Sequence, residues 1–174
     1  MLKPDSGKEE ALSNLTPLDG TDARILLALD RDPQATVVAL AADTGLARNT
    51  VQARLRRMTE SGALGRESRR IDPAALGYPL LALVTVSISQ RMRVQATEAL
   101  SALPEVLELL ATTGDGDLLA RVVARDTADL NRITEMLVDM PGIVRTSTAI
   151  VLKEVRPLRL DGLLERLATN AASR

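Results

Sequence analysis

The fold is decided by residues 45–62, which read GLARNTVQARLRRMTESG. Apolar side chains recur in this stretch at the spacing i, i+4 and i+7, which is typical of a helix with one buried face. They are Val51, Leu55 and Met58. We therefore predict a helix over residues 48–61, with Gly45 in a left-handed turn before it and Gly62 at its end.

Two other helices come before this one. An apolar stripe indicates a helix over residues 18–32, with Asp19 or Thr21 available as its N-cap. Residues 37–43 form the next helix, which Thr36 can cap. Because a tight glycine turn joins this helix to the third, the pair has the pattern of a helix-turn-helix.

The basic side chains cluster in and after the third helix. The 174-residue chain has a net charge of −1, yet residues 48–70 hold seven arginines against two glutamates. The segments on either side, residues 1–47 and 71–174, are acidic. A short basic island in an acidic protein indicates a local contact with a polyanion, and we predict double-stranded DNA.

The third helix presents polar side chains away from its apolar stripe. Arginine pairs with guanine, and asparagine or glutamine pairs with adenine, in the DNA major groove. We therefore predict base reading by Arg48, Asn49, Thr50, Gln52, Ala53 and Arg56. We predict phosphate contacts for the remaining arginines, which are Arg54, Arg57, Arg66, Arg69 and Arg70. The plain alternative is that an arginine-rich helix face is only solvated.

The second half of the chain alternates strands with helices. We predict strands over residues 81–89, 106–112, 118–124 and 143–155, and helices over residues 94–103, 127–140 and 161–168. The order β-α-β-β-α-β is that of a ferredoxin-like domain. Such a domain leaves one face of its sheet uncovered, which predicts a homodimer formed through that face. The fold class is therefore α+β.

The chain divides into five predicted segments. They are a flexible tail (1–17), a three-helix helix-turn-helix domain (18–64), a linker (65–78), a ferredoxin-like domain (79–157), and a C-terminal helix and tail (158–174).

The composition excludes several classes of chemistry. The chain has no Cys, His, Trp or Phe, and Tyr78 is its only aromatic residue. We therefore expect no zinc or other metal site, no catalytic thiol or imidazole, and no cofactor. An RNA-binding module of the same strand order needs exposed aromatic side chains, which this chain lacks. Since there is neither a signal-peptide pattern nor an apolar run long enough to cross a membrane, we expect a cytoplasmic protein without membrane contact.

The order of these features resembles the Lrp/AsnC family of transcriptional regulators. The resemblance is carried by LDGTD (18–22), LA (40–41), GL (45–46), TVQARLRRM (50–58), DP (72–73), LGY (76–78), PEV (104–106), TGD (113–115) and PGIVRTST (141–148). It implies an N-terminal winged helix-turn-helix domain and a C-terminal domain that regulates amino-acid metabolism. It also implies dimers that assemble further to tetramers or octamers, with an amino-acid effector bound between neighbouring subunits.

The resemblance implies where the effector binds. By analogy the site borders a hairpin loop and the start of the last strand, at Thr113, Gly114, Asp115, Gly116, Asp117, Thr146, Ser147 and Thr148. Turn amides and aspartate carboxylates can meet the carboxylate and the ammonium of an amino acid. The plain alternative is a simple Gly-Asp hairpin turn. The chain departs from the family at Ala47, where a capping serine is common, and at Gly116, where a large side chain is common.

Two other functions compete with a regulator. One is a small enzyme on a ferredoxin-like fold, although no pair of acidic residues recurs at a spacing that indicates general acid–base catalysis. The other is a non-catalytic ferredoxin-like protein for small-molecule sensing or oligomerisation. A sequence-specific DNA-binding regulator that responds to an amino acid or a related small molecule accounts for more of the sequence, and for it we expect no catalytic residues.

Overall fold

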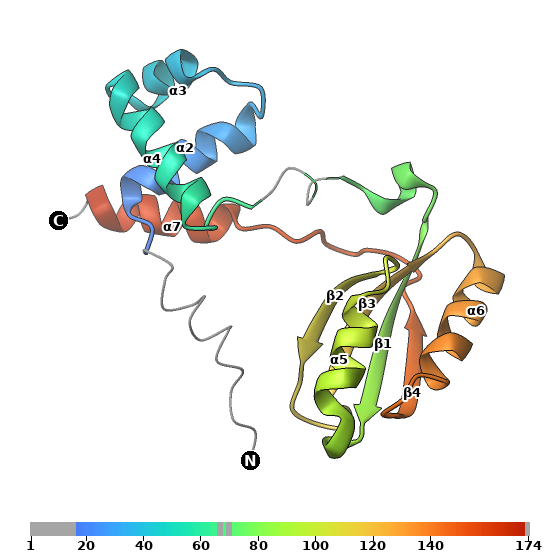
Figure 1. The fold of residues 1–174 in the computed structure, drawn as a ribbon. Helices are drawn as coiled ribbons and strands as arrows, with labels where there is room; N and C mark the ends of the chain where they lie inside the picture. The colour runs from blue at the N-terminus through green and yellow to red at the C-terminus, as the bar shows by residue number, and fades with distance from the viewer. Residues whose placement is uncertain (1–16, 66–67, 69–70, 173–174) are drawn as a thin grey trace. The chain divides into compact units, whose positions relative to one another are not determined.

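The computed structural model describes residues 17–65, 68 and 71–172, and these form two compact units (Figure 1). The helical unit contains the described residues within 17–68 together with 157–172. The sheet unit contains the residues within 71–156. The expected tail, residues 1–17, lies outside the described residues except for Pro17. None of the helices in these described stretches has the length and apolar character needed to span a membrane.

The helical unit begins with three helices close to their predicted positions. They are α2 (Gly20–Arg31), α3 (Val37–Thr44) and α4 (Arg48–Glu60). Their shared core consists of the buried side chains of Ile25, Ala28, Leu40, Val51 and Met58. The third helix therefore buries the stripe that its sequence predicts, with Leu55 half-buried at the edge of the core. This confirms the helix-turn-helix arrangement.

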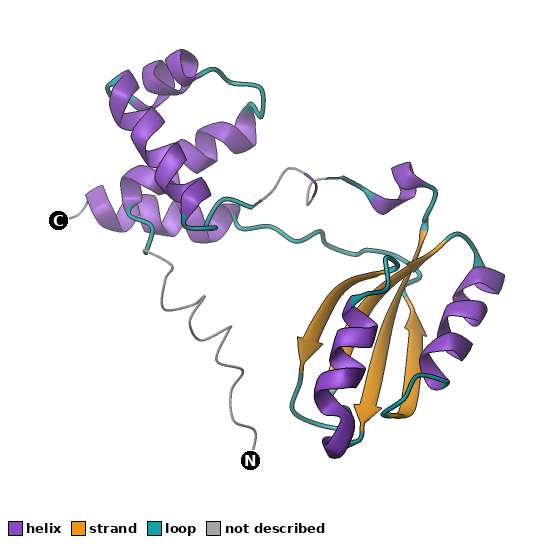
Figure 2. Ribbon diagram, viewed as in Figure 1, coloured by secondary structure: helices purple, strands orange, loops and turns teal. Residues whose placement is uncertain are grey.

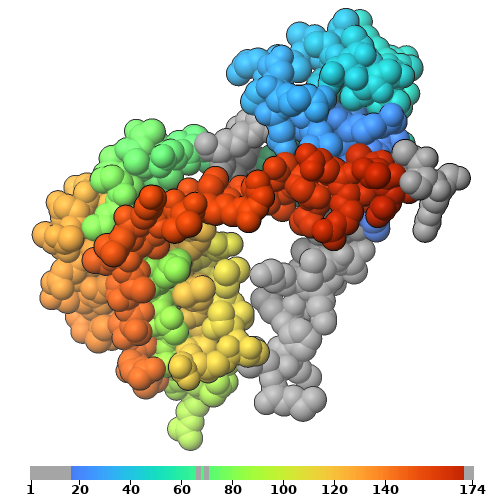
Figure 3. Space-filling view, turned by 180° about the vertical axis from the view of Figure 1, so that it is seen from behind, coloured from blue at the N-terminus to red at the C-terminus, as the bar shows by residue number. Residues whose placement is uncertain are grey.

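The C-terminal helix α7 (Asp161–Ala172) completes this unit by packing against α2, as Figures 1 and 3 show. Its Leu164, Leu167 and Ala168 are half-buried at helical spacing. On α2, Gly20 and Ala23 are buried, although neither belongs to the three-helix core. The sequence predicts a helix here that ends at residue 168, and it gives no indication that the helix joins the first unit.

The sheet unit has the predicted element order (Figure 2). Its strands are β1 (Leu80–Ile88), β2 (Val106–Ala111), β3 (Leu118–Ala124) and β4 (Ile143–Ile150). Its helices are α5 (Arg93–Ser101) and α6 (Thr127–Val138), with short 3-10 turns η2 (Pro73–Leu76) and η3 (Gln90–Met92). The strands lie in the order β2-β3-β1-β4 and every neighbouring pair is antiparallel. This confirms the ferredoxin-like fold and the α+β class.

The two faces of the sheet differ in their cover. Alternate residues of β1, from Ala82 to Ile88, are buried in a core that includes Leu100 of α5 and Ile133 of α6. The other face of β1 carries half-buried side chains, which are Leu81, Leu83, Thr85 and Ser87. Seen from behind, atoms of the strands reach the surface there (Figure 3). Among the described residues of this unit, no helix covers that face, as the sequence predicts.

The last predicted strand is shorter in the structure. The last strand ends at Ile150 rather than at residue 155, because β1 is its neighbour in the sheet and starts at Leu80. Beyond Ile150 the pair makes a bond from Val151 N to Leu81 O, at 2.8 Å, which lies one residue from the start of β1. In the predicted linker, residues 65–78, the structure contains η2, while residues 66, 67, 69 and 70 lie outside the described residues.

Candidate nucleic-acid interface and effector region

The turn between α3 and α4 sets the geometry of the helix pair. Gly45 has φ 68°, a left-handed conformation that favours glycine, and its N–H donates to the Ala41 carbonyl. At the start of α3 the Thr36 hydroxyl accepts a hydrogen bond from Ala39 N at 3.2 Å. At the start of α4 the N-cap residue is Ala47, which makes no side-chain hydrogen bond to the helix. A serine, which is common at this position by the resemblance, could make one. The first turn of α4 therefore lacks one stabilising contact.

The outward face of α4 carries all of the predicted base-reading residues. Their side chains are exposed, and they are Arg48, Asn49, Thr50, Gln52, Ala53 and Arg56. Val51 and Met58 are buried on the opposite side of the helix, at 0% and 1% exposure. The helix is thus held by its apolar side while its polar side is open to a ligand. Base reading by these side chains stays a prediction.

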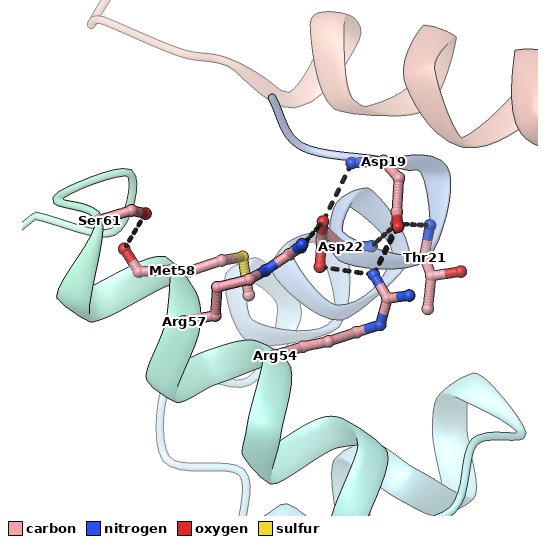
Figure 4. A network of polar contacts seen from close by, with 7 residues as sticks. All are labelled: Asp19, Thr21, Asp22, Arg54, Arg57, Met58 and Ser61. Carbon is pink, nitrogen blue, oxygen red and sulfur yellow. Dashed lines mark hydrogen bonds and ion pairs between the residues drawn. The ribbon is translucent and has the colours of Figure 1, made fainter. Parts of the chain in front are cut away.

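Two predicted phosphate contacts, Arg54 and Arg57, have carboxylate partners within the chain (Figure 4). Both guanidinium groups bond the carboxylate of Asp22, which is fully buried. The distance from Arg54 Nη1 to Asp22 Oδ1 is 2.9 Å. The same Arg54 nitrogen lies 2.6 Å and 2.8 Å from the two oxygens of Asp19. These contacts give the two arginines a structural role that the sequence does not predict.

The two aspartates also cap α2 in a reciprocal way. The Asp19 carboxylate accepts from Thr21 N and Asp22 N, at 2.8 Å and 2.9 Å, while Asp22 Oδ2 accepts from Asp19 N at 3.0 Å. Partial burial acts to raise the pKa of Asp19, but hydrogen bonds from Arg54 and from the backbone N–H groups outweigh it and hold this pKa below its ordinary value. Asp19 is therefore a carboxylate at neutral pH.

A shallow groove of about 450 Å³ runs beside the network on α4. Asn49, Thr50 and Ala53 line it together with Arg54 and Arg57. The groove therefore joins three predicted base-reading residues to the two arginines that the aspartates hold. The other predicted phosphate contacts, Arg66, Arg69 and Arg70, lie outside the described residues.

The buried carboxylate is a functional feature that the sequence analysis missed. Asp22 lies in the apolar stripe of the first helix, where a charged residue is costly unless it is paired. A charged residue in an apolar stripe was the sign, in the sequence, that a buried ion pair was present. Its partners lie 32 and 35 residues further along the chain, so only the folded structure identifies them.

The predicted effector loop and the start of β4 lie at the same end of the sheet, on either side of β1. Asp117 N donates to the Val86 carbonyl at 2.9 Å, and Thr146 is the register partner of Val86 on the other side. Thr113, Gly114 and Asp115 are exposed in the loop. Ser147 and Thr148 are exposed on β4, and Thr146 is half-buried. The structure thus places the two predicted parts of the site at one end of the sheet, on opposite sides of β1.

Two contacts in this region differ from those expected of a preformed amino-acid binding site. The Asp117 carboxylate already accepts from Ile88 N at 2.8 Å and lies 3.5 Å from Arg93 Nη2, so the chain itself uses this charge. Thr146 and Thr148 line a groove of about 430 Å³ against α6, with Thr134, Glu135, Val138 and Asp139. The two threonines therefore open toward α6, rather than toward the loop.

Gly116 is buried, and the reason is its contact with β1. A Cβ atom at this position would lie 2.2 Å from Cγ2 of Thr85 and 3.3 Å from the carbonyl oxygen of Val86. The Gly116 carbonyl accepts from the Thr112 hydroxyl at 3.0 Å, which closes the loop. The absence of a large side chain here follows from how tightly this loop packs.

Comparison with known proteins supports both units. A family model described as the AsnC-type helix-turn-helix domain matches residues 18–59, and one described as the Lrp/AsnC ligand binding domain matches residues 81–160. The HTH-type transcriptional regulator FL11 of Pyrococcus horikoshii is 34% identical over 137 residues, which cover 79% of this chain and 91% of that protein. The regulator AldR of Mycolicibacterium smegmatis is 34% identical, over 80% of this chain and 84% of that protein.

Solved structures agree with these matches. Transcriptional regulator NMB0573 of Neisseria meningitidis, in complex with L-Met, aligns with a TM-score of 0.73 at 26% identity, over 84% of this chain and 99% of that one. AsnC of E. coli aligns with a TM-score of 0.75 at 24% identity, over the same shares, and so shows the likeness of fold. With both family models matched in chain order and relatives one-third identical along most of their length, this chain belongs to the Lrp/AsnC family of HTH-type, DNA-binding transcriptional regulators.

Proposed function

We propose that the exposed face of α4 reads operator DNA in the major groove. The observation that carries the proposal is the exposure of all six predicted base-reading side chains on a helix whose opposite side is anchored by Val51 and Met58. Within this face Arg48 and Arg56 suit guanine, and Gln52 suits adenine. A contact pattern of this kind discriminates between bases, because each good bidentate pair contributes about 1–3 kcal/mol.

Phosphate contacts come from the basic segment that follows α4. These phosphate contacts are made by Arg66, Arg69 and Arg70, which follow the reading helix in the sequence. Arg54 and Arg57 are assigned instead to holding α4 in place, because their guanidinium groups bond Asp19 and Asp22.

The test is binding of the full-length protein to an operator selected from random DNA. R48A and Q52A should each weaken operator binding by about 5- to 150-fold, as expected for one lost base contact. R24A is the matched control, because Arg24 is exposed on α2 and its loss removes a charge from the same unit. Equal losses in R24A and R48A would contradict base reading by α4. Absence of any sequence preference in the unchanged protein would contradict the proposal as a whole.

The sheet unit senses an amino acid bound between subunits. Support comes from the family model for a ligand binding domain, from the L-Met complex of NMB0573, and from the position of residues 113–117 and Thr146 at the same end of the sheet. A panel of amino acids should include at least one that raises the melting temperature of this unit or changes its assembly state. If none does, the effector assignment fails while DNA reading by α4 is unaffected.

Subunits associate through the uncovered face of the sheet, first as a homodimer and then as a tetramer or octamer. Apolar residues at its centre, such as Leu81 and Leu83 on β1, support this surface. Sedimentation should show that L83K gives monomers. V138K is the matched control, because Val138 is exposed on α6 at the helix-covered side. A dimer that survives L83K would exclude this face as the interface.

A further inference from the structure

We propose that Asp19 is a specificity-determining residue for DNA binding, because its carboxylate pairs with Arg54 and so prevents this guanidinium from binding DNA phosphates. The inference rests on the proposed function, in which α4 contacts DNA. Arg54 lies on α4 and lines the same groove as the predicted base-reading residues Asn49 and Thr50. Its side chain turns back toward α2 and ends on two aspartates (Figure 4).

The two aspartates that bind Arg54 differ in their exposure to solvent. Asp22 is fully buried and is shared with Arg57, so it acts as the anchor beneath α4. The Asp19 side chain is 52% exposed, and it meets the same Arg54 nitrogen from the solvent side at 2.6 Å. Asp19 thus occupies the approach to Arg54 that a phosphate oxygen would use, with the same charge-assisted geometry.

The groove on α4 gives this arrangement a consequence for DNA. Arg54 lines the groove together with Asn49 and Thr50, so a DNA backbone that approaches these residues also approaches the guanidinium. A free arginine there would bind any phosphate, regardless of sequence, and would strengthen operator and non-operator binding alike. Asp19 neutralises that contact, so that a larger part of the affinity comes from Arg48, Gln52 and their neighbours.

The variant D19N tests this directly. Asparagine is as good an N-cap as aspartate, so α2 keeps its cap while the charge on residue 19 is removed. One released phosphate contact steepens the dependence of log affinity on log salt by about 0.9. Between 50 and 200 mM salt, D19N should therefore lose about 3.5-fold more affinity than the unchanged protein. At low salt its binding to non-operator DNA should strengthen more than its binding to the operator.

Two further variants separate this effect from general charge and from folding. D30N removes one charge from the exposed end of α2, away from the arginine pair, and should leave the salt slope within experimental error of the unchanged protein. In an R54Q background, D19N should no longer change the slope, because its target is absent. A structural role alone would change the melting temperature but not the salt slope or the ratio of operator to non-operator affinity.

The outcomes are distinct. Equal slopes for D19N and D30N, or an effect of D19N that persists in R54Q, would overturn the inference while leaving base reading intact. Failure of the proposed function would be seen in different measurements. The unchanged protein would show no sequence preference, or R48A would bind the operator with full affinity.

Discussion

Substituting Gly116 with alanine tests how tightly the loop between β2 and β3 packs on the sheet. The added Cβ would lie 2.2 Å from Thr85 Cγ2, far inside van der Waals contact. Thr85 sits on β1 with register partners on both sides, Leu119 and Ser147, so its backbone has little room to move. Overpacking of this kind costs about 1–3 kcal/mol. For a unit of this size the melting temperature should therefore fall by roughly 4–20 °C.

The measurement is chemical and thermal unfolding followed by circular dichroism, with hydrogen exchange to locate the loss in β1 and β3. T85S removes the clashing Cγ2 and keeps the hydroxyl, so the double variant G116A/T85S should recover most of the lost stability. G162A is the matched control, because Gly162 lies in α7 with open space around its Cβ position and should be neutral or stabilising by up to about 1 kcal/mol. A fully stable G116A, or no recovery in the double variant, would refute the proposed contact.

Three further predictions concern single side chains. T36A should destabilise the helical unit by about 1 kcal/mol through loss of the α3 cap, measured by denaturant unfolding. M58A should cost about 2–5 kcal/mol in the same assay, since Met58 is buried in the three-helix core. Hydrogen bonds from Arg125 and Arg132 hold the pKa of Asp129 well below its ordinary 3.8, so its stabilising contribution is present above about pH 4 and is lost as the pH falls through the lowered pKa. Unfolding of D129N should accordingly depend less on pH in the acid range, and an unchanged acid profile would contradict the pairing.

Elements with local signals could be predicted from the sequence. The cap at Thr36, the left-handed Gly45 and the helix end at Gly62 depend on residues within one turn, and the structure confirms them. Of the two cap candidates for the first helix, the structure uses Asp19. The order of strands and helices along the second half of the chain could be predicted from alternation and turn residues in the same way. The end of β4 could not, because it depends on where β1 begins in the register.

Contacts between distant segments could not be predicted. The arginine cluster indicated DNA, but nothing local shows that Arg54 and Arg57 turn away from the outward face of α4 to meet a carboxylate more than 30 residues earlier. The same holds for Gly116, whose neighbour Thr85 lies on another strand. The exposed side of α4 was predictable because helical periodicity alone decides which residues oppose Val51 and Met58.

The packing of α7 on α2 makes the helical unit discontinuous in sequence, with the whole sheet unit inserted between its two parts. During synthesis the N-terminal helices leave the ribosome first, but α2 gains its contacts with α7 only after residues 161–172 have emerged. The sheet unit, complete by residue 156, can fold before that. The DNA-binding unit therefore reaches its full stability only after the sheet unit has been synthesised, and a chain cut short after the sheet would carry an incomplete one.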